Sequence, residues 1–251
     1  MKVITLNLRN FTDDHWEERL PLIGNDIIQY GAQILAFQEV RGYIDPLKGK
    51  DMAQQVQEYL LDKGSPYPYL VEQKAMVYMG QGVWEGLAIL STLPISGWGY
   101  EKLDLGSGSD SNKRIMLWAR FDPDDGPLYV SDNHFSYDKV QALGNARQVI
   151  SYLNDSKFKY PGLLVGDLNA TPDDPAITYI KDNNWSDIWE QIWPKENGFT
   201  YESGNATKRI DYQWKNIYFS KKIQGIERVF TEKDPGTGEY PSDHYGLMIT
   251  F

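Results

Sequence analysis

Cysteine is absent from the 251-residue chain, which excludes disulfide bonds, thiolate nucleophiles and zinc sites built on thiolates. Long apolar runs are also absent. None approaches the ~20 residues that a membrane-spanning helix needs, so we expect no stable insertion into a membrane. The N-terminal segment, MKVITLNL, has a strand-like pattern and lacks the apolar region of a secretory leader. We therefore expect a cytoplasmic protein if the chain is complete, and a secreted one if a leader has been removed.

Basic residues are scarce. The chain has 25 lysines and arginines against 35 aspartates and glutamates, which gives a formal net charge of −10. Such an acidic excess argues against broad, non-specific binding to a nucleic-acid backbone. It does not exclude a phosphate substrate, because a divalent cation and a few well-placed basic side chains can reverse the charge locally.

The composition is that of a folded protein. A hydrophobic fraction of 41% over 251 residues can fill a large core. The sequence has no internal repeat, no linker and no long charged block. We therefore expect a single domain over residues 1–251, and a monomer.

Hydrophobic periodicity predicts a mixture of strands and helices. The segment 16–30 has apolar residues at helical spacing, with Asp13 and Asp14 as candidate N-terminal caps. The segment 34–40 is almost entirely apolar, which is typical of a central strand. The other expected helices are 51–62, 141–153 and 175–182, and the other expected strands are 3–8, 69–79, 85–91, 114–121, 128–133, a segment from Leu163, 210–220, 225–230 and 246–251. This order favours mixed sheets with helices outside them over a strict alternation of strand and helix.

The stretch LLVGDLNATPDD, from Leu163 to Asp174, ends an apolar strand with two polar side chains. Alternation along a strand places Asp167 and Asn169 on the same face. Open α/β folds commonly place ligand groups where the chain leaves the sheet. A simple polar turn is the alternative, because Asp and Asn favour turns. This segment alone does not decide between the two interpretations.

The same pattern recurs at other expected strands. Asn7 lies within ITLNL, Glu39 ends ILAFQE, His134 ends LYVSDNH, Asp211 lies within KRIDYQW, and Asp243 and His244 precede YGLMITF. Each residue alone has a structural explanation, such as a capped turn or a hydrogen-bonded buried histidine. Structural explanations of this kind become harder to accept for all of these residues together, because buried carboxylates need partners. Oxygen ligands without cysteine suit Mg²⁺, Mn²⁺ or Ca²⁺, and histidines transfer protons. The combination suits attack by activated water on a phosphate ester.

These residues lie in segments that resemble the endonuclease/exonuclease/phosphatase superfamily, which has the deoxyribonuclease-I-like fold. The matching segments are TLNLRN, FQEV, EGLAILS, RIMLWARF, DNHF, VGDLNATPDDPAI, KRIDYQW and PSDHYG. GDLN followed by SDH at this distance is the specific part of the signal. The resemblance implies an α+β fold, a four-layer α/β/β/α sandwich of two mixed β-sheets flanked by helices. It also implies a site at one edge of the sheets, where the polar strand ends converge.

The resemblance implies a role for each polar residue. Glu39 would be the principal metal ligand, with Asn7 and Asp243 beside the metal as ligands or supports. The metal would be Mg²⁺, with Mn²⁺ or Ca²⁺ as alternatives. Asp167 would orient or deprotonate the attacking water. Asn169 would donate a hydrogen bond to a phosphate oxygen as charge develops there.

The remaining roles concern the two histidines and their neighbours. His244 would hydrogen-bond the phosphate or transfer a proton, with Asp211 fixing its tautomer. His134 would face it across the phosphate and assist the leaving oxygen. Glu85 matches a position that supports a histidine in some relatives. Arg114 matches a phosphate-contacting basic position, although a solubilising strand-edge residue is an equal alternative.

Arg9 departs from the pattern, because some nuclease members have an aspartate there as an extra metal contact. This argues against a second metal at that place and suggests that Arg9 adds positive charge near the substrate.

The sequence thus predicts a metal-dependent phosphodiesterase. Its substrate would be a nucleic acid, a phospholipid or a small phosphate compound, and a phosphomonoesterase is the catalytic alternative. A non-catalytic binding or scaffold protein on the same fold is the other alternative. Such a protein would be expected to have lost Glu39, Asp167 or His244, and all three are present.

Overall fold

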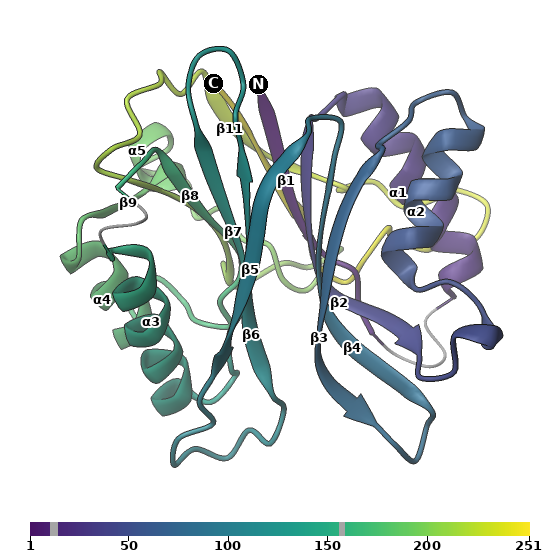
Figure 1. Ribbon diagram of the computed structural model, residues 1–251, viewed down its shortest axis with the longest axis horizontal. Helices are drawn as coiled ribbons and strands as arrows, with labels where there is room; N and C mark the ends of the chain where they lie inside the picture. Colours follow the sequence, from purple (N-terminus) through teal and green to yellow (C-terminus); the bar gives the residue numbers. More distant parts are fainter. Residues whose placement is uncertain (11–14, 156–158) are drawn as a thin grey trace.

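The computed structural model describes residues 1–10, 15–155 and 159–251. The candidate caps Asp13 and Asp14 lie outside the described residues. Two six-stranded β-sheets face each other, and helices cover the outer face of each (Figure 1). The predicted four-layer α/β/β/α arrangement is therefore confirmed.

The first sheet has the strand order β11-β12-β1-β2-β4-β3. At its centre β1 runs parallel to β2, and every other pair in this sheet is antiparallel. The crossover between these two strands is helix α1. The strand bounds are β1 (Lys2–Asn7), β2 (Ile34–Tyr43), β3 (Tyr69–Tyr78), β4 (Val83–Ser91), β11 (Gly225–Val229) and β12 (Gly246–Thr250).

The second sheet repeats this plan with the order β5-β6-β7-β8-β10-β9. Its central pair, β7 and β8, is parallel, and helix α3 makes the crossover. The other pairs in this sheet are antiparallel. The strand bounds are β5 (Ile95–Leu103), β6 (Arg114–Phe121), β7 (Leu128–His134), β8 (Gly162–Asp167), β9 (Trp185–Asp187) and β10 (Asp211–Asn216).

Side-chain caps set where several helices begin. The Asp51 side chain accepts a hydrogen bond from the Gln54 N–H, so α2 begins at Met52. The Asp138 side chain accepts from two backbone N–H groups, so α3 begins at Lys139, two residues before the expected start. The helix bounds are α1 (Trp16–Tyr30), the short 3-10 helix η1 (Pro46–Lys48), α2 (Met52–Asp62), α3 (Lys139–Leu153), α4 (Pro175–Asp182) and α5 (Ile188–Ile192).

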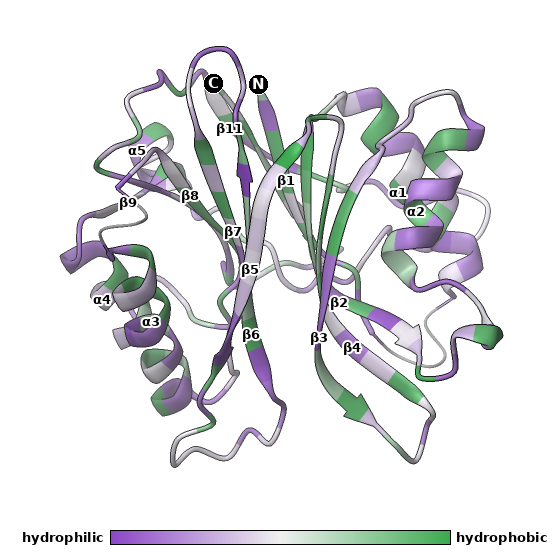
Figure 2. Ribbon diagram, viewed as in Figure 1, coloured by the Kyte–Doolittle hydropathy of each residue, from purple (hydrophilic) through white to green (hydrophobic). Residues whose placement is uncertain are grey.

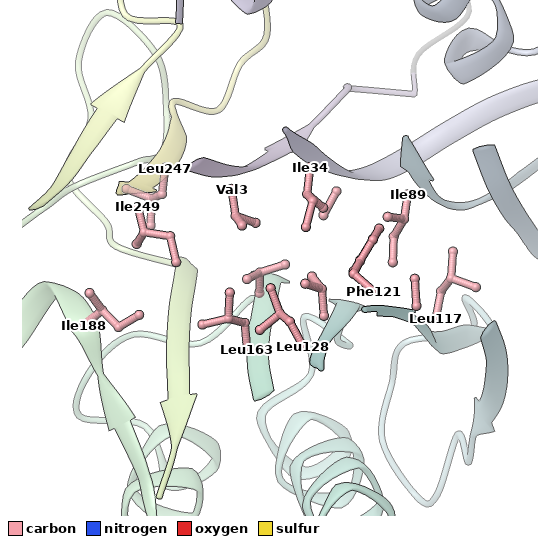
Figure 3. Packing of buried hydrophobic residues seen from close by; sticks show 14 of the residues in the cluster. Val3, Ile34, Ile89, Leu117, Phe121, Leu128, Leu163, Ile188, Leu247 and Ile249 are labelled. Carbon is pink, nitrogen blue, oxygen red and sulfur yellow. The ribbon is translucent and has the colours of Figure 1, made fainter. Parts of the chain in front are cut away.

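Three hydrophobic clusters separate the four layers. The central cluster lies between the sheets, and Figure 3 shows Val3 and Ile34 of the first sheet pointing toward Leu128 and Leu163 of the second. A second cluster joins α1 and α2 to the first sheet, and a third joins α3 and α4 to the second. Figure 2 shows hydrophobic residues along the strands of both sheets, and hydrophilic residues along much of α2 and α3.

Four elements were not expected from the sequence, namely η1, β5, β9 and α5. Strand β5 is an edge strand that contains two glycines and leaves Trp98 half-exposed, so its pattern is weak. Strand β9 has only three residues and α5 only five, which is too short for periodicity to show. Among the described residues, no helix is long and apolar enough to cross a membrane.

Candidate active site

Strand register brings three of the predicted residues together. In the parallel pair β7 and β8, His134 lies opposite Asp167. In the antiparallel pair β8 and β10, Asp167 lies opposite Asp211. The ends of three neighbouring strands therefore place His134, Asp167 and Asp211 side by side at one edge of the second sheet.

Gly166 makes this strand end possible. Its φ of +128° is a conformation that side chains rarely adopt, and a Cβ there would lie 2.0 Å from the Asn133 carbonyl oxygen. Only glycine fits such a position without moving the backbone. The glycine of GDLN thus lets β8 approach β7 closely just before Asp167.

Glu39 does not end its strand, and this prediction was wrong. Strand β2 continues to Tyr43, and its pairing with β4 is interrupted between Phe37 and Val40. Glu39 lies in this interruption with a φ of +55°. A bulge re-aims a side chain that regular alternation would place elsewhere. The irregular backbone therefore directs Glu39 into the cleft described next.

A cleft of about 540 Å³ opens at this edge of both sheets. Eight of the eleven predicted site residues line it: Glu39, Glu85, Arg114, His134, Asp167, Asn169, Asp243 and His244. Two more lie buried directly beneath the lining, where Asn7 hydrogen-bonds Glu39 and Asp167, and Asp211 hydrogen-bonds His244.

Arg9, which was expected to add positive charge near the substrate, does not belong to the described residues that line this cleft. Its backbone N–H donates to Asn7 Oδ1 at 2.9 Å, so it helps to orient the Asn7 amide.

The Asn7 side chain links the two sheets at the base of the cleft. Its Nδ2 donates to Glu39 Oε1 at 3.1 Å and to Asp167 Oδ2 at 3.0 Å. Asn7 is the last residue of β1, whereas Asp167 is the last residue of β8. One amide therefore holds a carboxylate of each sheet at a fixed separation.

Asn169 lies beyond the end of β8, so strand alternation is not what aims it into the cleft. Its φ is +48°, its backbone N–H donates to Asp167 Oδ1 at 2.9 Å, and its Nδ2 donates to the Phe135 carbonyl at 3.1 Å. Asp167 and Asn169 line the same cleft, but the expected strand alternation is wrong for Asn169, which lies in the turn after β8.

His244 is held by carboxylates. Its Nδ1 lies 3.0 Å from Asp211 Oδ2, and its Nε2 lies 3.8 Å from Asp167 Oδ2. The Tyr201 ring packs against the imidazole at a centroid distance of 4.8 Å. Burial lowers the pKa of His244, but the charges of Asp211 and Asp167 outweigh it and raise the pKa to about 10.

His134 is held by a cation. Arg114 Nη1 lies 3.0 Å from both of its ring nitrogens, and Glu85 Oε1 lies 3.7 Å from its Nδ1. Burial, followed by the charges of Arg114 and His244, holds the pKa of His134 well below 6.5. The expected support of a histidine by Glu85 is present as a contact, and Arg114 shares it.

The cleft carries more carboxylate charge than its cationic side chains balance. Burial and the charge of Glu85 raise the pKa of Glu39 to about 7. Burial and the charge of Asp211 raise the pKa of Asp167 to about 6. Clustered oxygen donors with raised pKa values suit a hard divalent cation, which would lower them.

Two sets of three His, Asp or Glu side chains have ligand atoms within 4.8 Å of one another in the described part of the chain. Asp167, Asp211 and His244 form the buried set, which belongs to this cleft. His15, Glu18 and Glu239 form the other set, which does not line the cleft and is largely exposed.

Sequence reasoning missed several residues of the site. Asn10 donates from its backbone to Glu39 and from its side chain to Glu85. The Tyr78 hydroxyl donates to Glu85 at 2.8 Å. Tyr137 and Tyr201 line the cleft from loops. Asn10, Tyr137 and Tyr201 lie outside the strands, so the pattern of polar strand ends could not find them, and Tyr78 ends β3 with an aromatic residue rather than a carboxylate, an amide or a histidine.

Comparisons with known proteins agree with this geometry. A sequence profile described as the Endonuclease/Exonuclease/phosphatase family matches residues 4–244. A search of proteins with curated descriptions found no match.

Several solved structures are similar over nearly their whole length. An endonuclease/exonuclease/phosphatase family protein from Leptotrichia buccalis has a TM-score of 0.79 at 17% identity, covering 100% of this chain and 98% of that one. D. rerio TDP2 with a single-strand DNA product has a TM-score of 0.72 at 15% identity, with 99% and 97% covered. A Bacteroides thetaiotaomicron mannosyl-6-phosphatase has a TM-score of 0.70 at 17% identity, with 100% and 98% covered. At these identities the likeness shows a shared fold.

Proposed function

The chain belongs to the endonuclease/exonuclease/phosphatase family, and from this premise we propose that it is a divalent-metal-dependent phosphoesterase that hydrolyses a phosphodiester by in-line attack of water. The observation that carries the proposal is spatial. Glu39, Asp167 and His244 come from three separate parts of the sequence and line one cleft. A non-catalytic relative would have no need to keep this arrangement.

Glu39 would hold the metal, with Asn7 and Asp243 beside it. The residues fit this role, because Glu39 combines a raised pKa with a position at the cleft surface. When bound, Mg²⁺ offsets the charge of the ester and lowers the pKa of water, and Mn²⁺ or Ca²⁺ are the alternatives. The Asn7 amide bridges Glu39 and Asp167 through its two hydrogen bonds and so fixes the distance between them.

Asp167 is the residue proposed to orient and deprotonate the attacking water. Burial and the charge of Asp211 raise the pKa of Asp167 to about 6 in the metal-free site, and a bound cation would lower it, so the carboxylate is ionised at neutral pH and can accept a proton. Asn7 and the backbone of Asn169 fix the carboxylate through hydrogen bonds. The Asn169 amide lies at the cleft surface, where it can donate to a phosphate oxygen.

His244 is proposed to donate a hydrogen bond to the phosphate. With a pKa of about 10 it is charged at neutral pH, so both ring nitrogens carry protons. Nδ1–H donates to Asp211 Oδ2, which leaves Nε2–H to donate to the substrate. His134, with Arg114 beside it, would assist the leaving oxygen on the other side.

A phosphomonoesterase is the second candidate. The solved structures that resemble this chain include both a mannosyl-6-phosphatase and TDP2 with a single-strand DNA product. The same cleft could therefore serve a small phosphate compound, a nucleic acid or a phospholipid headgroup.

A substrate panel tests the proposal. Hydrolysis of bis-p-nitrophenyl phosphate, p-nitrophenyl phosphate, DNA, RNA, sphingomyelin and sugar phosphates would be followed with Mg²⁺ and Mn²⁺. The Asn169→Ala variant is expected to lose about 10²–10³ in rate, because it removes a transition-state hydrogen-bond donor. Turnover of this variant at the wild-type rate would contradict the assignment of Asn169. An inert wild-type protein across the panel would favour the non-catalytic alternative.

A further inference from the structure

The loop that joins β5 to β6, residues 104–113 with the sequence DLGSGSDSNK, hides a carboxylate. Most of the loop is exposed, as its composition suggests. The side chain of Asp110, however, is fully buried. A carboxylate in such a position needs several partners to offset its lost hydration. The composition of an exposed polar loop does not by itself explain why this carboxylate is buried.

Asp110 has a complete set of partners. Its Oδ2 accepts from Ser136 Oγ at 2.9 Å and from Arg114 Nη2 at 3.3 Å. Its Oδ1 accepts from the Asn112 backbone N–H at 2.8 Å. The Gln141 side chain bonds both the N–H and the carbonyl of Asp110, at 3.0 and 2.9 Å. These bonds fix Asp110 from the segment after β7, from α3 and from its own loop.

Arg114 is the partner that reaches the cleft. Its side chain is only 6% exposed and lies between Asp110 and Glu85, 3.6 Å from the latter. One nitrogen, Nη2, faces Asp110, and the other, Nη1, faces His134. The buried Nε has no hydrogen-bond partner among the described residues. The two terminal nitrogens therefore carry the contacts that orient the guanidinium.

We propose that Asp110 is a positioning residue, which holds Arg114 beside His134 at the phosphate-binding part of the cleft and acts on the reaction only through Arg114. This inference rests on the proposed phosphoesterase function. A planar guanidinium recognises phosphate through its orientation, so a fixed carboxylate behind it determines how it is presented.

Other hydrogen bonds hold the loop besides the contact with Arg114. Ser109 donates from its N–H and its hydroxyl to Asp138 Oδ2, at 3.0 and 2.9 Å. The Gln141 side chain also donates to the Leu105 carbonyl. The loop is thus tethered to the start of α3 independently, and a bond to Arg114 is the additional contact that a purely structural Asp110 would not require.

The Asp110→Asn variant tests the proposal. It keeps the side-chain size and one carbonyl oxygen, but removes the charge that faces Arg114. Loss of a hydrogen bond between charged groups typically costs enough free energy to lower a rate constant about 10- to 100-fold, so we expect kcat/KM to fall by this factor. The inhibition constant of inorganic phosphate should weaken by a similar factor. The Mg²⁺ concentration for half-activation should not change, because in the described part of the chain Asp110 hydrogen-bonds Ser136, Arg114 and Asn112 but none of the proposed metal residues.

Two further variants make the test specific. Arg114→Lys retains the charge but cannot bridge Asp110 and His134, and we expect the same loss. The double variant should lose no more than either single variant, since coupled residues are not additive. Ser109→Ala is the matched control: it weakens the other tether of the same loop, and its kcat/KM should equal that of the wild type.

Wild-type kcat/KM in Asp110→Asn, or losses that multiply in the double variant, would overturn the proposal. Arg114→Lys tests the same link if Asp110→Asn does not fold, and a wild-type rate for Arg114→Lys would also overturn it. If the wild type hydrolyses no ester, the proposed function fails. The affinity for inorganic phosphate, measured by calorimetry, then tests Asp110 separately, and equal affinity in wild type and Asp110→Asn would overturn the inference.

Discussion

The two histidines of the cleft differ in what surrounds them. His244 lies between Asp211 and Asp167, whereas His134 lies against Arg114. The two side chains are equally buried, yet one pKa is raised to about 10 and the other is held well below 6.5. Burial disfavours the charged form of both, so the difference comes from the neighbours.

Strand order supplies those neighbours. Asp211 begins β10 and Arg114 begins β6, and these strands lie on opposite sides of the central pair of the second sheet. In the proposed reaction, the cationic imidazole would donate a hydrogen bond to the phosphate, and the neutral one would assist the leaving oxygen.

Loss of the charged histidine should have the largest effect. His244→Ala removes the proposed hydrogen-bond donor to the phosphate, and we expect kcat to fall by about 10²–10³. Circular dichroism would verify that the variant folds. Near-wild-type turnover on every phosphoester that the wild type hydrolyses would show that the charge of His244 has no catalytic role.

Removal of the charge next to His244 should make the site pH-sensitive. Asp211→Asn can still bond Nδ1, but it no longer raises the pKa of His244, so the imidazole loses its proton at a lower pH. We expect kcat at pH 8 to fall by about 10- to 100-fold, and kcat at pH 6 to fall much less. A pH–rate profile measures this, and equal losses at both pH values would contradict the account.

The neutral histidine, His134, should affect how the free energy of unfolding depends on pH. In the metal-free wild type, the unfolded chain binds a proton at His134 below about pH 6.5, and the folded chain does not. This group therefore lowers the free energy of unfolding as the pH falls. His134→Gln removes the dependence, so its loss of stability between pH 8 and pH 5 should be smaller than that of the wild type.

Urea unfolding at the two pH values measures this difference. The same experiment on His244→Gln is the internal comparison. The charged His244 stabilises the fold fully below pH 6.5, and this contribution is lost as the pH rises toward 10. Parallel pH dependences for the two variants would show that the histidines share one protonation state.

The smallest expected effect concerns Glu72, which lies outside the cleft and whose pKa is also set by burial and a neighbouring charge. Burial and the charge of Asp51 raise the pKa of Glu72 from 4.5 to about 7, so this group lowers the free energy of unfolding as the pH rises from about 4.5 to about 7. Glu72→Gln should raise the free energy of unfolding at pH 8 by about 1 kcal/mol, a value reduced for partial exposure, and change it little at pH 4.5. Glu101→Gln, at an exposed position, is the control and should have no effect at either pH.

Much of the site could be predicted because the change from apolar to polar residues shows in the sequence where a strand ends. Asp167 and His134 follow from apolar strands that stop at polar residues, Asp211 follows from a carboxylate within KRIDYQW, and the register shows that the three meet. The two mixed sheets could be predicted from the resemblance and from the order of strands and helices.

The remaining features depend on backbone detail or long-range packing. A glutamate at a φ of +55° inside a strand has no sequence signature, so the bulge at Glu39 could not be foreseen. Asp110 lies among glycines and serines, where an aspartate normally indicates a turn, and only the fold shows that it is buried beneath Arg114. Edge strand β5 was missed because its glycines and exposed residues weaken the alternation.

The most direct measurement is the metal dependence of bis-p-nitrophenyl phosphate hydrolysis by the wild type and by Glu39→Gln. The account predicts Mg²⁺-dependent turnover that EDTA abolishes, and a much higher Mg²⁺ requirement in the variant. Turnover that survives EDTA, or a variant that matches the wild type at every Mg²⁺ concentration, would contradict it.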